Sequence, residues 1–495
     1  ASSDWTISNN SFYQTATRTY TGTSAVDIGA IAVASTANGY NFTITNNFIG
    51  GTAPNCGGGP MTYTGGTTGT PTPRLIRFSS AVGAFSNINN NTIANISVTT
   101  ASTSTASGLI THLNGNANIN GNTLGSMTTT GNISFIFTGT ATTPFFLPVS
   151  IGTGATPSTV VANNNQIGGI NLSTSSTGAV SFRVMYAQPV AGSKVTFSGN
   201  TIGSPTVPNS IQQSTNSQLV AILLINPSTD GVITNNTICN LTGNNAAGTT
   251  ISVRGIDVQG AGGRHTITGN TVYNLTNNGA TASINNAASV VGINMTASAI
   301  GSNIVAGNTV YNLSNTNATA ATWVNGITVV SPPLPATASP VTRNNIHSLS
   351  TLSPTSGMAG IFCLGAGGYS PVINNFIRLG IDGNGANVSV SSQINGIYKA
   401  ASVSQNISFN TVYIGGLDVT SGTVNTYAFR RSASGPADTV MNNIFFNARS
   451  NATGTGKHYA TFLNANNALI SNHNDLFVNG TGGVLGLSVA TDYAT

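Results

Sequence analysis

Charge is the property that this chain has least of. Charged residues make up 5% of its 495 residues, the nine acidic residues are all aspartate, and glutamate is absent. Roughly a quarter of the residues of an ordinary soluble domain are charged. The surface must therefore be kept soluble by asparagine, serine, threonine and glycine, a habit that is typical of secreted and fibrous proteins.

Basic clusters and long apolar runs are missing too. The net charge of +5 is spread over a long chain, mostly on isolated arginines. No basic cluster is interleaved with aromatic residues, so we expect no nucleic-acid partner. No run of about 18 apolar residues occurs, so we expect no membrane insertion.

What the chain does contain is a repeat. The pattern Ile-x-Gly/Asn-Asn-x-Ile/Val recurs about every 36 residues, as in Ile44 to Ile49 and Ile267 to Val272, and such a fixed period indicates stacked repeats. Apolar and polar residues alternate within each copy, which is strand spacing. A second short strand, opened by a small residue as at Gly326-Ile327, completes the repeat. No segment has a sustained helical period, so essentially no helix is expected.

The second asparagine of the motif forms one column of the repeat. A side-chain amide both donates and accepts hydrogen bonds, so identical asparagines stacked at strand spacing can bond to one another and to the turn backbone. The predicted column contains Asn10, Asn47, Asn91, Asn122, Asn200, Asn236, Asn270, Asn308, Asn344, Asn375 and Asn410. Looser copies of the motif occur at Asn165, Asn442 and Asn474.

This column resembles the asparagine ladder of right-handed parallel β-helix proteins, the pectin-lyase-like fold. The resemblance covers nearly the whole chain and implies an all-β parallel solenoid of about 13–14 coils, with about 36 residues per coil. We expect one domain over residues 1–495, as a segment of a longer repeat protein. Inserted loops are expected at about residues 50–73, 139–158, 204–217 and 331–339.

The sequence gives little support for an enzyme. Enzymes of the pectin-lyase-like fold use clusters of acidic residues with Ca²⁺, arginine, histidine or lysine, whereas the aspartates here are dispersed over different coils. Glycoside hydrolysis needs two facing carboxylates roughly 5–10 Å apart. Asp257 is the one aspartate with other ionisable residues in its coil, namely Arg254, Arg264 and His265. We interpret that group as a surface salt bridge. We predict no catalytic residue, no metal site and no cofactor.

Cys56, Cys239 and Cys363 are too far apart along the stack to pair. At roughly 4.8 Å per coil the separations exceed the reach of a disulfide, so three free thiols are expected. Cys239 is expected to point outward and Cys363 inward.

The residue after each aliphatic of the motif is expected to point outward. It is small in the first half of the chain, as at Gly125 and Gly203, which would let something approach closely. In the second half it becomes large and aromatic, and the second strand changes in the same way. The predicted surface contains Tyr273, Tyr311, His347, Tyr413 and Phe445 in the first column, and Phe362 and Tyr398 in the second. These residues form either a self-supporting ladder or a contact surface for a partner or carbohydrate.

Repeats rich in asparagine, threonine and glycine, with almost no charge, resemble the β-helical surface and adhesin-like proteins that Bacteroidota secrete. We expect a non-enzymatic structural protein at the bacterial cell surface, either an adhesin stalk or a filament subunit that associates with itself end to end or laterally. The alternatives are a carbohydrate-active or carbohydrate-binding β-helix protein, such as a polysaccharide lyase or hydrolase, and a phage tail fibre. An extracellular polysaccharide or a cell-surface molecule is a further candidate partner.

Overall fold

The computed structural model describes residues 4–493 except 22–24, 38, 66–69, 102–106, 141–143, 153, 176, 226–229, 261, 286, 297–301, 331–337, 366–368, 418, 434 and 465–468. The chain forms two compact units, unit 1 (Ala1–Ile251) and unit 2 (Ser252–Thr495). Each unit is described by itself below.

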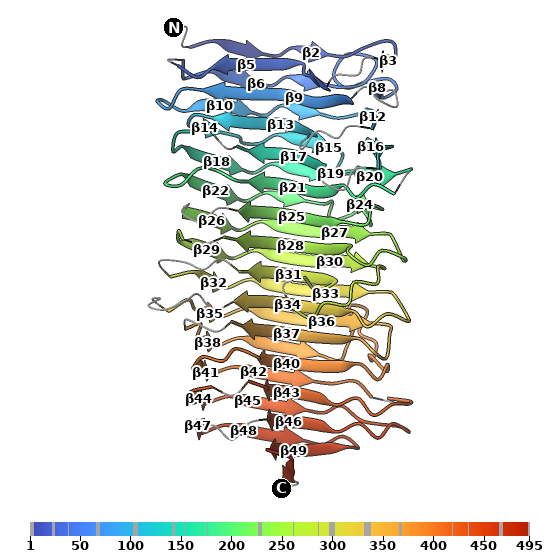
Figure 1. The fold of residues 1–495 in the computed structure, drawn as a ribbon, viewed down its shortest axis with the longest axis vertical. Coiled ribbons are helices and arrows are strands. Elements are labelled where there is room, and N and C mark those ends of the chain that lie inside the picture. Colours follow the sequence, from blue (N-terminus) through green and yellow to red (C-terminus); the bar gives the residue numbers. More distant parts are fainter. Residues whose placement is uncertain are drawn as a thin grey trace. The chain divides into compact units, whose positions relative to one another are not determined.

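Both units are built from stacked turns of parallel strands (Figure 1). The chain is a right-handed parallel β-solenoid of about 12 turns with about 35 residues per turn. The predicted fold class is therefore confirmed. The expected number of 13–14 coils came from counting copies of the motif. A complete turn lies between two successive copies, so there are fewer complete turns than copies. The described residues contain no helix, so none there is long and apolar enough to cross a membrane.

Within each turn the chain passes in order through three sheets, here called sheets 1, 2 and 3. In unit 1, sheet 1 contains β1 (Thr6–Ser8), β6 (Thr43–Thr45), β10 (Ser86–Asn89), β14 (Ala117–Asn118), β18 (Thr159–Asn163), β22 (Lys194–Ser198) and β26 (Asp230–Thr234). Sheet 2 contains β2 (Ser11–Phe12), β3 (Arg18–Tyr20), β7 (Phe48–Ile49), β8 (Met61–Gly65), β11 (Thr92–Ile93), β12 (Ile96–Thr100), β15 (Thr123–Gly125), β16 (Ile133–Phe137), β19 (Gln166–Gly168), β20 (Ile170–Thr174), β23 (Thr201–Ile202), β24 (Ile211–Gln213) and β27 (Thr237–Gly243). Sheet 3 contains β4 (Ala25–Ile28), β5 (Ile31–Ser35), β9 (Thr70–Ser80), β13 (Ser107–Asn114), β17 (Phe145–Ile151), β21 (Ser181–Ala187) and β25 (Gln218–Ile225).

Unit 2 repeats this arrangement. Its sheet 1 contains β29 (His265–Thr268), β32 (Ile304–Ala306), β35 (Val341–Thr342), β38 (Val372–Ile373), β41 (Asn406–Ser408), β44 (Asp438–Met441) and β47 (Leu469–Asn472). Sheet 2 contains β30 (Thr271–Asn277), β33 (Thr309–Asn315), β36 (Asn345–Thr351), β39 (Phe376–Leu379), β42 (Thr411–Ile414), β45 (Ile444–Asn447) and β48 (Asp475–Val478). Sheet 3 contains β28 (Ser252–Gln259), β31 (Val290–Met295), β34 (Trp323–Val330), β37 (Gly357–Leu364), β40 (Gln393–Lys399), β43 (Thr426–Arg431), β46 (His458–Leu463), β49 (Gly483–Ser488) and β50 (Thr491–Tyr493). Strand β50 runs antiparallel to β49.

The motif sits at the corner between sheets 1 and 2. Its first Gly or Asn has a positive φ, as at Asn46 (55°) and Gly307 (64°), which turns the chain by a conformation that these residues adopt easily. The following asparagine is buried in every ladder member from Asn47 to Asn443, and the aliphatic after its neighbour enters the core. Ile49, for example, pairs with Phe12 in the preceding turn and with Ile93 in the next. The repeat therefore sets both the corner and the register.

The predicted asparagine ladder is confirmed. Asn91 is typical: its side-chain Nδ2 and its backbone N–H both donate to Oδ1 of Asn122 at 3.0 Å. Its Nδ2 also donates to the carbonyl of Ile44 in the preceding turn at 2.9 Å. In unit 1 the ladder contains Asn10, Asn47, Asn91, Asn122, Asn165, Asn200 and Asn236. In unit 2 it contains Asn270, Asn308, Asn344, Asn375, Asn410, Asn443 and Asn474.

Phe409 occupies the left-handed position of the corner with a φ of 57° and is 58% exposed. A non-glycine residue in this conformation costs about 1–2 kcal/mol. We expect Phe409→Gly to raise the free energy of unfolding by about 1 kcal/mol, because glycine relieves the strain of the folded state. The greater entropy that glycine gives the unfolded chain offsets part of this gain. Urea denaturation would measure it. Asn374→Gly, at the same corner position with a φ of 56°, is the control and should change little, and a destabilised Phe409→Gly would contradict the prediction.

Three of the four expected loop segments contain strands of the solenoid. Residues 50–73 include β8 and the start of β9, residues 139–158 include β17, and residues 204–217 include β24. The Gly- and Thr-rich composition hid short stretches of alternating burial, such as Met61 and Tyr63, which face the core. In the fourth segment, residues 331–337 lie outside the described residues.

A glycine inside the sheet 3 strand lets sheets 2 and 3 approach each other in unit 2. A Cβ on Gly326 would lie 2.6 Å from Cγ2 of Ile346 in sheet 2 and 2.6 Å from the carbonyl oxygen of Gly360 in the next turn. Gly360 meets Ile377 and Gly396 in the same way. Only glycine fits where the core is this thin.

Candidate functional site

A column of half-buried side chains follows the outer face of sheet 2 in unit 2. Tyr273 pairs with Tyr311, and Tyr311 with His347. The ring centroids in both pairs are 4.9 Å apart, with interplanar angles of 1° and 14°. The rings therefore cover one another's faces and leave mainly their edges to solvent.

The column continues toward the C-terminal end of the unit with changed geometry. His347 pairs with Arg378 and Arg378 with Tyr413. Tyr413 then meets Phe446 at 5.1 Å and 86°, and Phe446 meets Phe477 at 4.8 Å and 79°. These edge-to-face contacts leave ring faces uncovered, and Phe477 is 49% exposed. The outer ladder thus contains Tyr273, Tyr311, His347, Arg378, Tyr413, Phe446 and Phe477.

The prediction that Phe445 points outward is wrong. Phe445 is 1% exposed, pairs with Val412 in the core and stacks on Phe429 at 5.3 Å. The sequence Asn442-Asn443 offers two asparagines, and Asn443 takes the ladder position. A shift of one residue turns every side chain to the other face of the strand, so Phe446 is the outward residue.

Phe362 and Tyr398 lie in one column of sheet 3 but are 2% and 8% exposed. Ile284 of the segment before β31 packs against them. The expected open surface is therefore covered at these two residues, because a loop of unit 2 crosses it.

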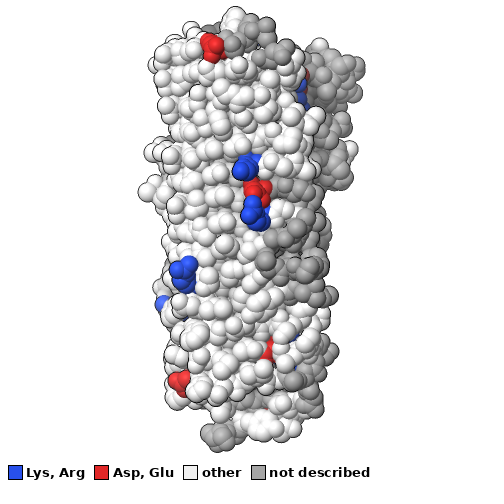
Figure 2. Space-filling view, turned by 90° about the vertical axis from the view of Figure 1, so that its left-hand side faces the viewer, with Lys and Arg blue, Asp and Glu red and all other residues white. Residues whose placement is uncertain are grey.

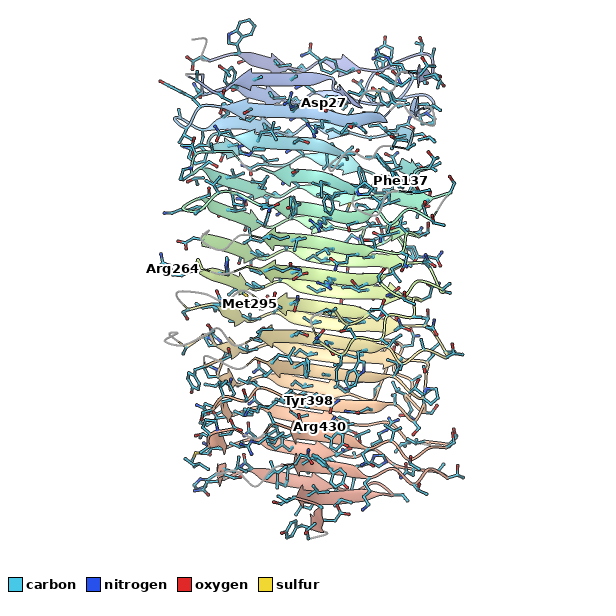
Figure 3. The ribbon with its side chains drawn as sticks, in the orientation of Figure 1. Asp27, Phe137, Arg264, Met295, Tyr398 and Arg430 are labelled. Atoms are coloured by element: carbon cyan, nitrogen blue, oxygen red, sulfur yellow. The ribbon has the colours of Figure 1, made fainter. Side chains whose placement is uncertain are left out.

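Arg430 follows Tyr398 in that column and lies among aromatic rings (Figure 3). Its guanidinium carbon is 4.5 Å from the ring centre of Tyr398, 4.8 Å from Tyr427 and 5.8 Å from Phe462. Cation–π contacts of this kind contribute about 0.5–2 kcal/mol.

In unit 1 the small residues that were expected to point outward are buried, and they admit the backbone of the next turn. A Cβ on Gly203 would lie 1.6 Å from the carbonyl oxygen of Cys239, and one on Gly125 would lie 2.0 Å from that of Gly168. Close approach at these positions was predicted from sequence, and what approaches is a neighbouring turn.

The three cysteines are free, as predicted. Cys239, however, is fully buried, with its Sγ 3.5 Å from the carbonyl oxygen of Gly203, so its expected outward position is wrong. Cys363 is buried as expected, and burial raises the pKa of its thiol to about 12.

Arg254 and Asp257 form a buried ion pair and not the surface bridge that we expected. Arg254 Nη1 lies 2.6 Å from Asp257 Oδ2, and the carboxylate is fully buried. Gln259 and Asn294 donate to its two oxygens at 2.8 and 2.7 Å. Such saturation with hydrogen bonds is what a buried charge requires.

Charged residues that the sequence analysis missed lie inside unit 2. Lys399, Arg431 and Asp438 are 0–1% exposed and meet at the corner between sheets 3 and 1. Arg449 is 1% exposed and donates to the carbonyls of Val388 and Val390 at 2.8 and 2.7 Å. Burial lowers the pKa of Arg449 to about 10.

Two buried histidines make each unit sensitive to acid. Burial lowers the pKa of His112 in unit 1 from 6.5 to about 4, and burial together with the Arg449 charge does the same to His458 in unit 2. Both rings are hydrogen-bonded, His112 to the Gly115 carbonyl oxygen at 2.8 Å and His458 to Thr426 at 2.9 Å.

We expect both units to lose stability as the pH falls from about 6.5 to about 4, by about 3 kcal/mol for each histidine at most. In this window the unfolded chain binds the proton and the folded chain does not, so protonation favours unfolding; above it the stabilisation is complete. Urea titrations from pH 7.5 to 4 would measure the slope. His458→Gln should flatten it for unit 2, and unchanged slopes would contradict the assignment.

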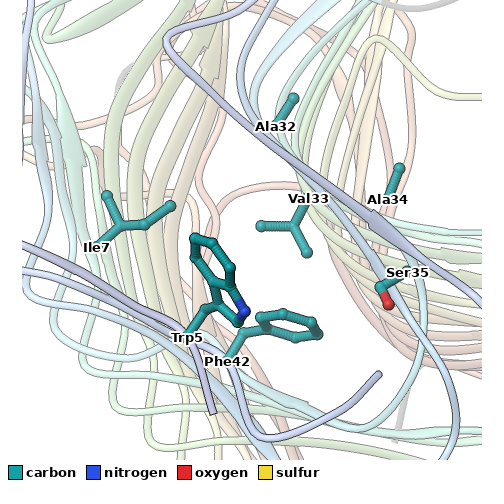
Figure 4. Close-up of a pocket in the computed structure, with 7 residues that line it drawn as sticks. All are labelled: Trp5, Ile7, Ala32, Val33, Ala34, Ser35 and Phe42. Carbon is teal, nitrogen blue, oxygen red and sulfur yellow. The ribbon is translucent and has the colours of Figure 1, made fainter. Parts of the chain in front are cut away.

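An apolar hollow of about 320 Å³ lies at the first turns of unit 1 (Figure 4). Trp5, Ile7 and Phe42 face Ala32 and Val33 across it. It offers no ionisable group. In the described residues no three His, Cys, Asp or Glu side chains lie close enough together to hold a metal ion.

No protein-family model, no curated protein and no solved structure matches the chain.

Proposed function

We propose that the chain is a non-enzymatic structural protein of a bacterial cell surface, secreted and acting as an adhesin stalk or a filament subunit. The observation that carries this proposal is the stacking of Tyr273, Tyr311 and His347 with their faces against one another. A sugar ring would pack on the face of an aromatic ring, and here the stacking covers both faces of Tyr311 and one face each of Tyr273 and His347. The outer ladder, like the asparagine ladder inside, joins one turn to the next.

The rest of the surface supports the same function. Charged side chains are few on the face shown in Figure 2, as expected from a composition with 5% charged residues. Two aspartates of unit 2 are held in buried ion pairs: Arg254 pairs with Asp257, and Lys399 and Arg431 pair with Asp438. The sequence resemblance to secreted adhesin-like repeats points in the same direction.

Tyr311→Ala separates this function from carbohydrate binding. For a structural ladder we expect the free energy of unfolding of unit 2 to fall by about 1–3 kcal/mol, because two ring contacts and buried apolar area are lost, while retention on a glycan array is unchanged. Tyr13→Ala, an exposed tyrosine of unit 1, is the control. Loss of glycan retention at unchanged stability would overturn the structural reading.

Electron microscopy of the purified chain without ligand tests the filament version. Filaments with a regular axial repeat would support self-association, whereas isolated particles over a wide concentration range would exclude the filament and leave the stalk.

Carbohydrate binding is the second candidate, and one observation favours it. At Tyr413, Phe446 and Phe477 the rings turn edge to face, so ring faces are exposed there. If this end of the outer ladder binds glycans, Phe477→Ala should abolish retention on the array and leave stability nearly unchanged.

A further inference from the structure

The buried charges of unit 2 form a group around one carboxylate. Lys399 ends β40, Arg431 ends β43 in the next turn, and Asp438 begins β44. Lys399 Nζ lies 3.0 Å from Asp438 Oδ2, and Arg431 Nε lies 2.5 Å from the same oxygen. The backbone N–H of Gln405 donates to Oδ1 at 2.7 Å. Every polar atom of the carboxylate is therefore held in place.

This arrangement is unusual for the column in which it occurs. The position of Lys399 corresponds to Cys363 in the preceding turn and to Val329 in the turn before that. The lysine is 0% exposed, and its neighbours in the two preceding turns carry no charge at neutral pH. Burial is the main cause that lowers the pKa of the Lys399 ammonium, and contact with Asp438 opposes it. Burial thus favours the neutral amine, which is a nucleophile, beside a carboxyl group.

We propose that Lys399 and Asp438 condense to form an intramolecular amide bond that joins neighbouring turns of unit 2. The Lys399 ammonium first passes one proton to Oδ2 across the 3.0 Å contact, which leaves an amine facing a carboxylic acid. Nζ then forms a bond to Cγ, and Oδ1 takes up the negative charge. A second proton moves from nitrogen to Oδ2, the Cγ–Oδ2 bond breaks and water leaves. Atoms and charge balance without any other reagent.

The neighbours of the carboxyl group suit this reaction. The Gln405 N–H already points at Oδ1, where the charge develops, and acts as an oxyanion donor. Arg431 holds the carboxyl group in position through its contact with Oδ2. The fixed contact removes the entropic cost of bringing the reactants together. The product removes the desolvation cost of the Lys399 and Asp438 charges, and it leaves the Arg431 cation without its counter-charge.

Mass spectrometry of the folded chain tests the bond directly. We expect the denatured, reduced protein to be one water lighter than its sequence. Trypsin should fail to cut after Lys399 and should yield residues 379–430 joined to residues 432–449 in one species. Lys399→Arg keeps the positive charge but offers no amine, so its mass should equal that of its sequence.

Two outcomes would overturn the proposal. One is a wild-type mass equal to the sequence mass in protein that folds, which would leave an ion pair only. The other is a missing water confined to the peptide 432–449, with normal cleavage after Lys399, which would indicate a cyclic imide at Asp438. The Arg254–Asp257 pair is an internal control, because it is equally buried and a guanidinium does not condense in this way.

Discussion

Replacing Asn308 with alanine is expected to lower the free energy of unfolding of unit 2 by about 4 kcal/mol, because at least two buried polar groups lose their partners. Oδ1 of Asn308 accepts the backbone N–H and the side-chain Nδ2 of Asn270 at 3.0 and 2.9 Å. Its Nδ2 donates to the carbonyl of Ile267 at 3.0 Å. Water cannot replace these bonds, since Asn308 is 1% exposed.

Asn10 provides the matched control for the ladder. It makes the same side-chain bond, to Oδ1 of Asn47 at 3.1 Å, but it is exposed. Asn10→Ala should therefore cost about 1 kcal/mol or less. Chemical denaturation gives the two values, and hydrogen exchange should show the loss of protection in the turns that flank Asn308. Equal effects of the two substitutions would contradict the role of burial in the ladder.

Asp257→Asn is expected to destabilise unit 2 by about 3–5 kcal/mol, because it leaves the Arg254 cation buried without a counter-charge. Asparagine has nearly the same shape as aspartate, so the substitution removes charge and little packing. Thermal and urea denaturation measure the loss, and Asp257→Asn with Arg254→Met together should recover part of it.

Asp27→Asn is the control for the ion pair. Asp27 contacts Arg74 at 3.2 Å, but its side chain is 43% exposed, and exposed pairs contribute about 0–1 kcal/mol. A loss at Asp257 no larger than the loss at Asp27 would show that water reaches the pair.

The fold was predictable because each copy of the motif makes the same local choice. A residue that tolerates positive φ, an inward asparagine and an inward aliphatic recur together, so turn, register and core agree at every level. Counting copies could not reveal that the Gly- and Thr-rich stretches also pair as strands. Their alternation, as at Met61 and Tyr63, is short and hidden among turn residues.

The candidate site was predictable only where the register was unambiguous. Tyr311 and His347 follow a clear motif and lie in the outer ladder, whereas Phe445 follows two adjacent asparagines and was placed on the wrong face. The buried charges were missed because polar residues were expected to face solvent. Aligning Lys399 with Val329 in the register would have placed the lysine at an inward position. A charge at such a position needs a partner, which leads to the other buried charges.

The asparagine ladder also has a direction. Each side-chain amide donates toward the C-terminal neighbour, as Asn47 does to Asn91 and Asn344 to Asn375. The amide dipoles therefore align head to tail and polarise one another. At any stage of synthesis the last finished turn presents unsatisfied donors, and the next turn to emerge brings the acceptor that they need. The ladder therefore grows from the N-terminal toward the C-terminal end, and each added turn presents the same unsatisfied donors to the next turn.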